Sequence, residues 1–194
     1  MGSDALAESL RQVEAIICGL TFEVAVGIDP SGAILFWRTG DDYSVGPTEE
    51  EWALVCDKIL THNHPPGGGS LQTEDLFRAK DHFLREVRAV TSDWIFIMRR
   101  PPTGWVTDDR IMDLTEATEG PIHSGVNWEE RPEWSRLFWH EMWLRIAPQI
   151  GYQYSWAPMW DVVEPAPLPT KPGLWPASTE YISPHDKRLR GGRE

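Results

Sequence analysis

At 194 residues, of which 41% are hydrophobic, the chain is long enough to bury the core of one domain. Its formal net charge of −12 disfavours broad binding to phosphate backbones, which needs a basic surface, so we expect no nucleic-acid partner. Cys18 and Cys56 give no disulfide framework, and no apolar run reaches the length of a membrane span, so we expect a cytoplasmic protein without membrane contact.

The N-terminal segment predicts a helix followed by a β-hairpin. Residues 4–18 repeat apolar side chains at helical spacing. Residues 22–28 and 33–38 each alternate like strands and are joined by a turn, which predicts the hairpin. Glu23 lies near the start of its first strand.

A second helix is predicted over residues 49–60. Thr48 is a suitable cap, and Glu49, Glu50 and Glu51 place negative charge in the first turn, where the helix dipole favours it.

The window LTHNHPPGGGSLQTED, from residue 60 to residue 75, holds the strongest chemical signal in the chain. His62 and His64 are two residues apart, which in an extended strand places both imidazoles on one face. Pro65 ends the strand, because proline cannot donate to a sheet ladder, and a glycine turn follows. Asp75 stands in the first turn of the next predicted helix, so the three side chains can meet around one point.

Two imidazoles and one carboxylate are typical protein ligands of a catalytic zinc site, since the fourth position stays open for water. We therefore predict that His62, His64 and Asp75 bind Zn²⁺. The alternative is that the histidines are polar surface residues and that Asp75 only caps a helix. The combination of His-X-His-Pro, a glycine turn and an acid at a helix start favours the metal.

Beyond this window, the pattern predicts a helix from residue 75 to residue 87, in which His82 is interpreted as a surface residue. Residues 88–92 and 94–98 are strand-like and form either a tight hairpin or one bent strand. Residues 107–125 are polar and acidic and lack a clear period.

An aromatic-rich helix is predicted over residues 128–150, with Pro132 in its first turn. Its aromatic stripe is typical of packing against a sheet and not of a ligand box. His140 and Glu141 do not form a zincin motif, because position 144 is leucine and not a second histidine.

Residues 157–194 are rich in proline, which predicts an extended tail with little regular structure, and Trp160 and Trp175 indicate that it lies against a surface. Residues 188–192, Arg-Leu-Arg-Gly-Gly, have the five letters that close ubiquitin, which is either a substrate-like tail or a chance similarity. We thus expect a core of residues 1–100, a helical extension of residues 101–156 packed on it, and a tail of residues 157–194.

The spacing in the histidine window resembles the signature of the JAB/MPN (JAMM) zinc metalloprotease superfamily. That signature is His-X-His-Pro, six residues, Ser, two residues and Asp, with a glutamate far upstream. Here His62 to Pro65 are followed by six residues, then Gln72, two residues and Asp75. The motif sequence His-Asn-His-Pro is most similar to that of the RadC-like and phage-associated branches. One position departs, because Gln72 stands where the family has serine.

The resemblance implies an α+β fold in which helices flank a mixed sheet. It also implies that Glu23, in the first strand after an N-terminal helix, acts as general base toward a zinc-activated water, with the glutamates of residues 49–51 as alternatives. The family serine helps to hold the substrate carbonyl oxygen, and here Gln72 or the nearby Ser70 would take that role.

The function implied by the resemblance is a zinc-dependent peptidase or isopeptidase. Its substrate would be a protein or peptide, and the Gly-Gly tail of a ubiquitin-like modifier is one candidate. The alternative from another class is a JAB/MPN-like domain that binds partners without cutting, which the Gln72 departure favours. A phage-associated, toxin-associated or DNA-linked role rests on analogy with those branches alone. The letters His-Asn-His are not an HNH nuclease signature, which spreads over a longer hairpin and helix.

Overall fold

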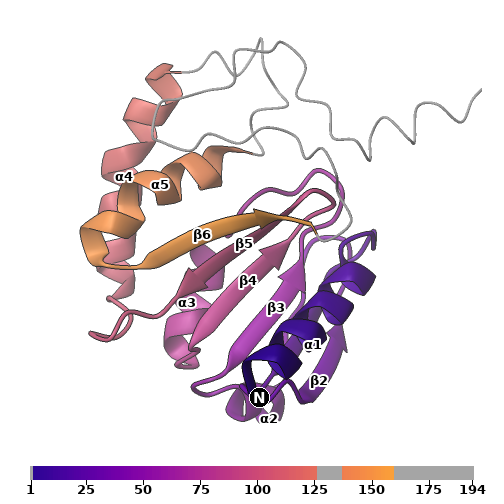
Figure 1. Ribbon diagram of the computed structural model, residues 1–194. Helices are drawn as coiled ribbons and strands as arrows, with labels where there is room; N and C mark the ends of the chain where they lie inside the picture. Colours follow the sequence, from indigo (N-terminus) through magenta and orange to yellow (C-terminus); the bar gives the residue numbers. More distant parts are fainter. Residues whose placement is uncertain (1, 126–136, 160–194) are drawn as a thin grey trace, which may run out of the picture.

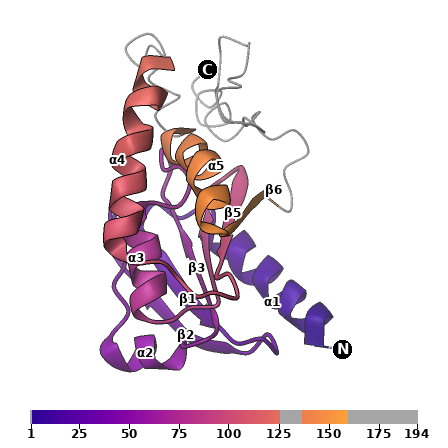
Figure 2. The same cartoon turned by 90° about the vertical axis from the view of Figure 1, so that its left-hand side faces the viewer.

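The computed structural model describes residues 2–125 and 137–159. These residues form one mixed six-stranded sheet with helices on both faces, arranged in three layers (Figure 1 and Figure 2). The α+β fold class predicted from the sequence is therefore confirmed. In the order β2-β1-β3-β4-β5-β6 the sheet contains β1 (Val24–Ile28), β2 (Ile34–Thr39), β3 (Ile59–Asn63), β4 (Glu86–Val90), β5 (Trp94–Arg99) and β6 (Gln153–Pro158).

The centre of the sheet is a parallel pair, β3 and β4, whereas the other neighbouring strands pair in antiparallel fashion. The connection from β3 to β4 passes through α3 (Thr73–Asp81), because parallel strands need a crossover. Both strands end at the same edge of the sheet, and this carboxyl edge is where open α/β sheets hold their ligands. The histidine window continues from the end of β3 at this edge.

Helix α1 (Gly2–Ile17) covers one face of the sheet (Figure 2). Its buried side chains include Leu10, Val13 and Ile17, at helical spacing. They belong to one cluster with alternate residues of β1, while Ala25 between them belongs to the cluster on the opposite face. Strand β1 is thus buried on both sides, which explains its nearly continuous apolar sequence.

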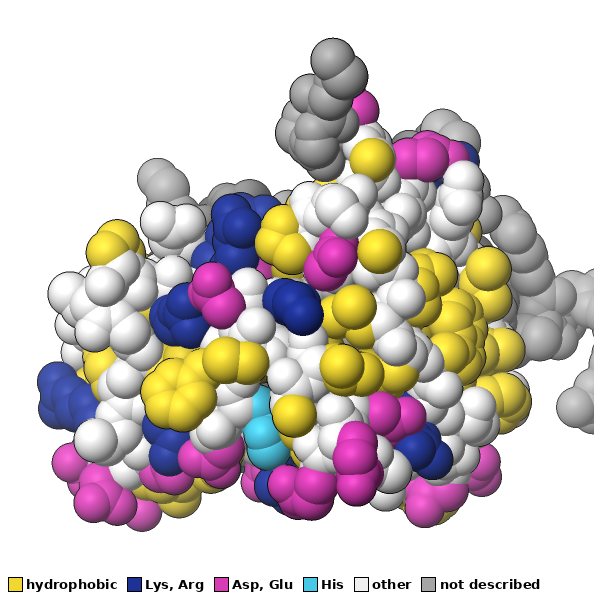
Figure 3. Space-filling view, turned by 90° about the horizontal axis from the view of Figure 1, so that it is seen from below, with side chains coloured by type: hydrophobic (Ala, Val, Ile, Leu, Met, Phe, Trp, Pro, Cys, Tyr) yellow, Lys and Arg dark blue, Asp and Glu magenta, His cyan; other side chains and the backbone are white. Residues whose placement is uncertain are grey.

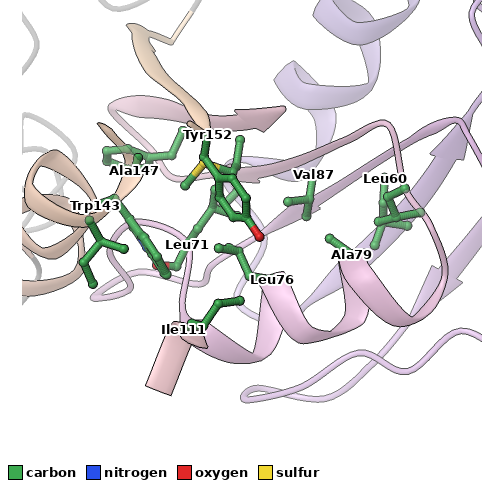
Figure 4. Close-up of a cluster of buried hydrophobic side chains, with 14 of the residues drawn as sticks. Leu60, Leu71, Leu76, Ala79, Val87, Ile111, Trp143, Ala147 and Tyr152 are labelled. Atoms are coloured by element: carbon green, nitrogen blue, oxygen red, sulfur yellow. The ribbon is translucent and has the colours of Figure 1, made fainter. Parts of the chain in front are cut away.

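The opposite face carries the larger hydrophobic cluster (Figure 4). Leu76 and Ala79 of α3 pack there with Val87 of β4. Trp143 and Leu71 belong to the same cluster, so the C-terminal half of the chain shares a core with the histidine window. Besides α3, the helices that contribute to this cluster are α2 (Glu49–Leu54), α4 (Asp108–Gly125) and α5 (Phe138–Ile150).

Helices α2 and α3 end earlier than the sequence predicted. They end at residues 54 and 81 instead of 60 and 87, because the apolar residues that follow enter β3 and β4. Beyond each helix, one residue has a left-handed backbone, Asp57 with φ 56° and Phe83 with φ 52°. The Asp57 N–H donates to the Phe83 carbonyl at 3.0 Å, so the two chain reversals support each other. Neither position carries the glycine that would have signalled a helix end.

Helix α4 occupies a segment in which the sequence showed no clear period. Its inward face includes Ile111, Thr115, Thr118 and Ile122, which are buried at helical spacing. Two of these four are threonines, which a hydrophobic pattern counts as polar. The buried threonines therefore concealed the period of the helix.

The segments after α3 form a tight hairpin of β4 and β5, and not one bent strand. Strand β6, from the predicted extension and the start of the predicted tail, adds an outer strand beside β5. In α5, Met142 and Ile146 are fully buried, as packing against the core requires. Residues 128–136 of the predicted aromatic-rich helix, Trp160, Trp175 and residues 188–192 lie outside the described residues.

No helix in the described part of the chain is both long and apolar enough to cross a membrane. Figure 3 shows a face on which acidic side chains gather along the lower margin. Basic side chains on this face are interspersed with acidic and hydrophobic ones. This distribution agrees with the formal net charge of −12.

Candidate metal centre

His62 and His64 are held side by side at the end of β3. His62 lies in β3, and the His64 N–H donates to the Val90 carbonyl at 2.8 Å, which extends the pairing with β4 past the end of the strand. Both rings are buried, and their Nε2 atoms are 3.0 Å apart. The strand geometry therefore brings two potential ligand nitrogens together in the interior.

Asp75 completes the group from the first turn of α3. Its Oδ2 accepts the main-chain N–H of Gln72 at 2.7 Å, so the carboxylate also caps the helix. Its Oδ1 is 3.1 Å from Nε2 of His62, and its Oδ2 is 3.8 Å from Nε2 of His64. Capping and facing the imidazoles are thus compatible roles, and the predicted convergence of the three side chains is confirmed.

The donor set suits a divalent metal ion such as zinc. Among the described residues, the ligand atoms of His62, His64 and Asp75 all lie within 4.8 Å of one another. Tetrahedral zinc with bonds of about 2.0–2.1 Å separates its ligand atoms by about 3.3 Å. The two Nε2 atoms are 3.0 Å apart and Asp75 Oδ1 is 3.1 Å from Nε2 of His62, both close to that value, whereas it is the other carboxylate oxygen, Oδ2, that lies 3.8 Å from Nε2 of His64. Three protein ligands leave one tetrahedral position open.

The glycine turn fixes the orientation of His64. Its Nδ1 donates to the Gly69 carbonyl at 2.8 Å, which leaves Nε2 as the nitrogen with a free lone pair. Gly68 passes so close that a Cβ there would lie 2.4 Å from the His64 Cβ. Only glycine allows the turn to wrap around the ring in this way.

Each side chain of the group shifts the pKa of the others. Burial lowers the pKa of His62, but Asp75 and Glu23 outweigh it, so this pKa lies above its ordinary value. Burial and the neighbouring His62 hold the pKa of His64 below its ordinary value. Burial raises the pKa of Asp75, but the His62 charge dominates and lowers this pKa to about 2. Without a metal, these shifts favour an ionised Asp75, a proton on His62 and a neutral His64.

The metal-ligand group opens onto a cleft of about 440 Å³. His62 and Asp75 line this cleft, and so does Glu23, which directly precedes β1. Burial raises the pKa of Glu23, His62 opposes this rise, and Asp75 adds to it. The Glu23 carboxyl group therefore shares the cleft with the ligands and is within electrostatic reach of them.

The glutamates of α2 lie differently. Glu51 takes part in the helix cap and pairs with Arg38 at 2.9 Å. Glu49 lines the same cleft as Glu23. By contrast, Glu23 contributes to the raised pKa of His62.

Ser70 and Gln72, the two predicted carbonyl-oxygen donors, do not belong to the cleft lining found among the described residues. Ser70 is fully buried, and its hydroxyl group is 2.8 Å from the hydroxyl group of Tyr154. The Tyr154 hydroxyl group in turn lies 2.7 Å from Nδ1 of His140, so Ser70, Tyr154 and His140 form a buried hydrogen-bonded network. Gln72 is exposed and precedes α3. Their role toward a substrate stays a prediction.

Arg78 and the loop of residues 44–47 line the cleft but were not singled out from the sequence. Arg78 lies three residues after Asp75 in α3, a spacing that places both on one helix face and could have indicated it. The loop carries no motif, and only the tertiary structure brings it to the cleft.

Comparison with known proteins gives no relative for this chain, because no protein-family model, no curated protein and no solved structure matches it.

Proposed function

We propose that this chain is a zinc-dependent metallopeptidase or isopeptidase. One observation carries the proposal: the ligand atoms of His62, His64 and Asp75 converge beside a cleft that also contains the partly buried Glu23. The sequence resemblance to the JAB/MPN (JAMM) superfamily supports the same four residues. The mixed sheet with flanking helices agrees with the fold that this resemblance implied.

The chemistry is hydrolysis of an amide bond. His62, His64 and Asp75 would hold the zinc ion, which when bound would supply a Lewis acid able to polarise a carbonyl group and to lower the pKa of water to about 7. Glu23 accepts a proton from the attacking water and transfers it to the leaving amine, so the products are a carboxylate and an amine. Its raised pKa suits the first step, since a more basic carboxylate accepts a proton more readily.

The proposed substrate is a protein or peptide that enters the cleft between α3 and the loop of residues 44–47. A basic segment complements a chain with a formal net charge of −12. The Arg-Leu-Arg-Gly-Gly tail of a ubiquitin-like modifier combines basic residues with two C-terminal glycines that have no side chains, so it is the first substrate to test.

The test compares zinc-loaded wild-type protein with the Glu23→Gln variant. Both are incubated with a Gly-Gly isopeptide and with a mixed peptide library, and cleavage is followed by mass spectrometry. We expect Glu23→Gln to keep its zinc and to lose about 10²- to 10⁴-fold in turnover, because it lacks the base. Glu49→Gln, on the same cleft, is the matched control and should stay close to wild type. Full activity of Glu23→Gln would reject Glu23 as the base.

A second candidate, a binding domain that does not cut, is favoured by one observation. Ser70 is hydrogen-bonded to Tyr154, and Gln72 is exposed. Neither is among the described residues that line the cleft. The same experiment separates the two functions. Stoichiometric zinc in the wild-type protein, without cleavage above the Glu23→Gln level, would support binding alone. A phage-associated or toxin-associated role stays a prediction from the resemblance.

A further inference from the structure

Asn63, the residue between the two ligand histidines, has a fully buried side chain that joins β3 to the chain entering β1. Its Oδ1 accepts the Val24 N–H at 2.7 Å. Its Nδ2 donates to the Phe22 carbonyl at 2.9 Å. Both polar atoms of the amide are therefore used, and both contacts go to main-chain groups.

The two contacts of Asn63 flank Glu23 on either side. The pairing of β1 with β3 ends at Ala25 and His62, and beyond this pair the Asn63 amide makes the connection in place of the main chain. The peptide groups of Glu23 itself are held from the other side, because its N–H donates to the Asp41 carbonyl at 2.7 Å and its carbonyl accepts the Gly40 N–H at 2.8 Å. Glu23 is thus fixed between β2 and the histidine window.

Asn63 is also fixed relative to the metal ligands, since it is covalently joined to His62 and His64. Strand residues alternate between faces, so the Asn63 side chain leaves β3 on the face opposite to the imidazoles. The amide can therefore hold the chain around Glu23 without entering the cleft, and it is not among the described residues that line the cleft.

We propose that Asn63 is a positioning residue that sets the distance between the Glu23 carboxylate and the metal ligands. The inference rests on the proposed function, in which Glu23 acts on water beside the metal. Asn63 touches neither the metal nor the substrate in this role. It acts through the main chain of residues 22–24.

The test uses full-length protein loaded with Co²⁺, whose visible spectrum reports ionisation beside the metal. The spectrum is recorded against pH for wild type, Glu23→Gln and Asn63→Ala. The absorbance of bound Co²⁺ plotted against pH has an inflection. We expect Glu23→Gln to shift the pH of this inflection, and Asn63→Ala to shift it in the same direction by at least half as much. Co²⁺ affinity of Asn63→Ala should fall less than about tenfold, because all three ligands remain. If Glu23→Gln moves the inflection and Asn63→Ala leaves it at the wild-type pH, the proposal is overturned.

Thr61→Val is the matched control. Thr61 lies two residues earlier in β3 and is fully buried. Its hydroxyl group donates a hydrogen bond to the Glu14 carboxylate at 3.1 Å and not to the chain around Glu23. We expect Thr61→Val to lower the melting temperature, as loss of a buried hydrogen bond does, without moving the inflection. An equal movement in Thr61→Val would assign the effect of Asn63→Ala to general destabilisation and overturn the proposal.

A metal-free measurement separates this inference from the proposed function. Asn63→Ser keeps a polar group at the buried position but is too short to reach both main-chain partners, so it also serves if Asn63→Ala does not fold. Crystals of metal-free Asn63→Ser should show the Glu23 carboxylate displaced from His62 relative to wild type. An undisplaced carboxylate would reject Asn63 as the positioning residue. If Glu23→Gln leaves the Co²⁺ inflection unchanged while the carboxylate is displaced, the proposed base fails and the positioning role stands.

Discussion

His62 and His64 are buried and Asp75 is partly buried at the edge of the sheet, where water cannot stabilise their charges fully. They compensate one another, because the His62 proton faces an ionised Asp75 while His64 stays neutral. A divalent cation would take the place of that single proton. Metal binding at this candidate site would therefore be coupled to the release of a proton.

We expect metal affinity to fall as the pH is lowered through the pKa of His62. This pKa is raised above the ordinary value of 6.5, so the proton competes with the metal up to a higher pH than on a free imidazole, and affinity should drop about tenfold per pH unit below the pKa. The pKa of Asp75 is about 2, and that of His64 is lowered, so neither adds a second proton near neutrality. Competition titrations with a chelator between pH 5 and pH 8 measure the slope. A slope of two protons would contradict this assignment of charges.

At the scale of elements, the glycine turn that holds His64 is itself held by the C-terminal half of the chain. Trp143 of α5 donates to the Leu71 carbonyl at 2.6 Å. Tyr154 of β6 bonds to Ser70 at 2.8 Å. The last helix and strand described therefore support the candidate metal centre, although they supply none of its three candidate ligands.

Tyr154→Phe and Tyr152→Phe test this support as a pair. Each variant removes one hydroxyl group with a known contact, from Tyr154 to Ser70 and from Tyr152 to the Val106 N–H at 2.9 Å. We expect each to cost about 1–3 kcal/mol in the free energy of unfolding, because the fully buried Ser70 and the partly buried Val106 each lose a hydrogen bond. Only Tyr154→Phe should also weaken zinc binding, by up to about tenfold. Calorimetric titration with Zn²⁺ measures the difference, and equal zinc affinities would show that β6 does not support the site.

At the scale of the whole molecule, the sheet separates two hydrophobic clusters, and one buried ionic group lies on the α1 side. Arg88 of β4 forms ion pairs with Glu14 of α1 at 2.5 Å and with Glu86 at 2.7 Å. Thr61 donates to the same Glu14 carboxylate at 3.1 Å. This network ties the N-terminal helix to β3 and β4, the strands that lead to the metal centre.

Arg88→Leu should lower the free energy of unfolding by about 3–5 kcal/mol, since it leaves Glu14 buried without its cation. Denaturation in urea at neutral pH measures the change. Arg11→Ala is the control, because Arg11 pairs with Glu8 on the exposed side of α1, and its loss should leave the unfolding midpoint almost unchanged. Equal midpoints for the two variants would show that the buried network contributes no more than a surface pair.

The sequence by itself determined the ligand group and much of the order of elements. The spacing of His62 and His64 places both rings on one face of any extended strand, and Pro65 with the glycine turn brings the chain back to Asp75. These are local relations, which depend on backbone geometry over a few residues. The order of helices and strands through β5 followed from the same local periodicity.

The tertiary structure alone decided where α2 and α3 end, because Asp57 and Phe83 adopt left-handed backbones that are supported by their contact with each other. It also decided that β6 joins the sheet and that the Ser70 hydroxyl group bonds to Tyr154. The use of the Asn63 amide on both sides of Glu23 belongs to the same class. Each of these features depends on groups far apart in the chain, and no local pattern records which distant partner will satisfy a buried polar group.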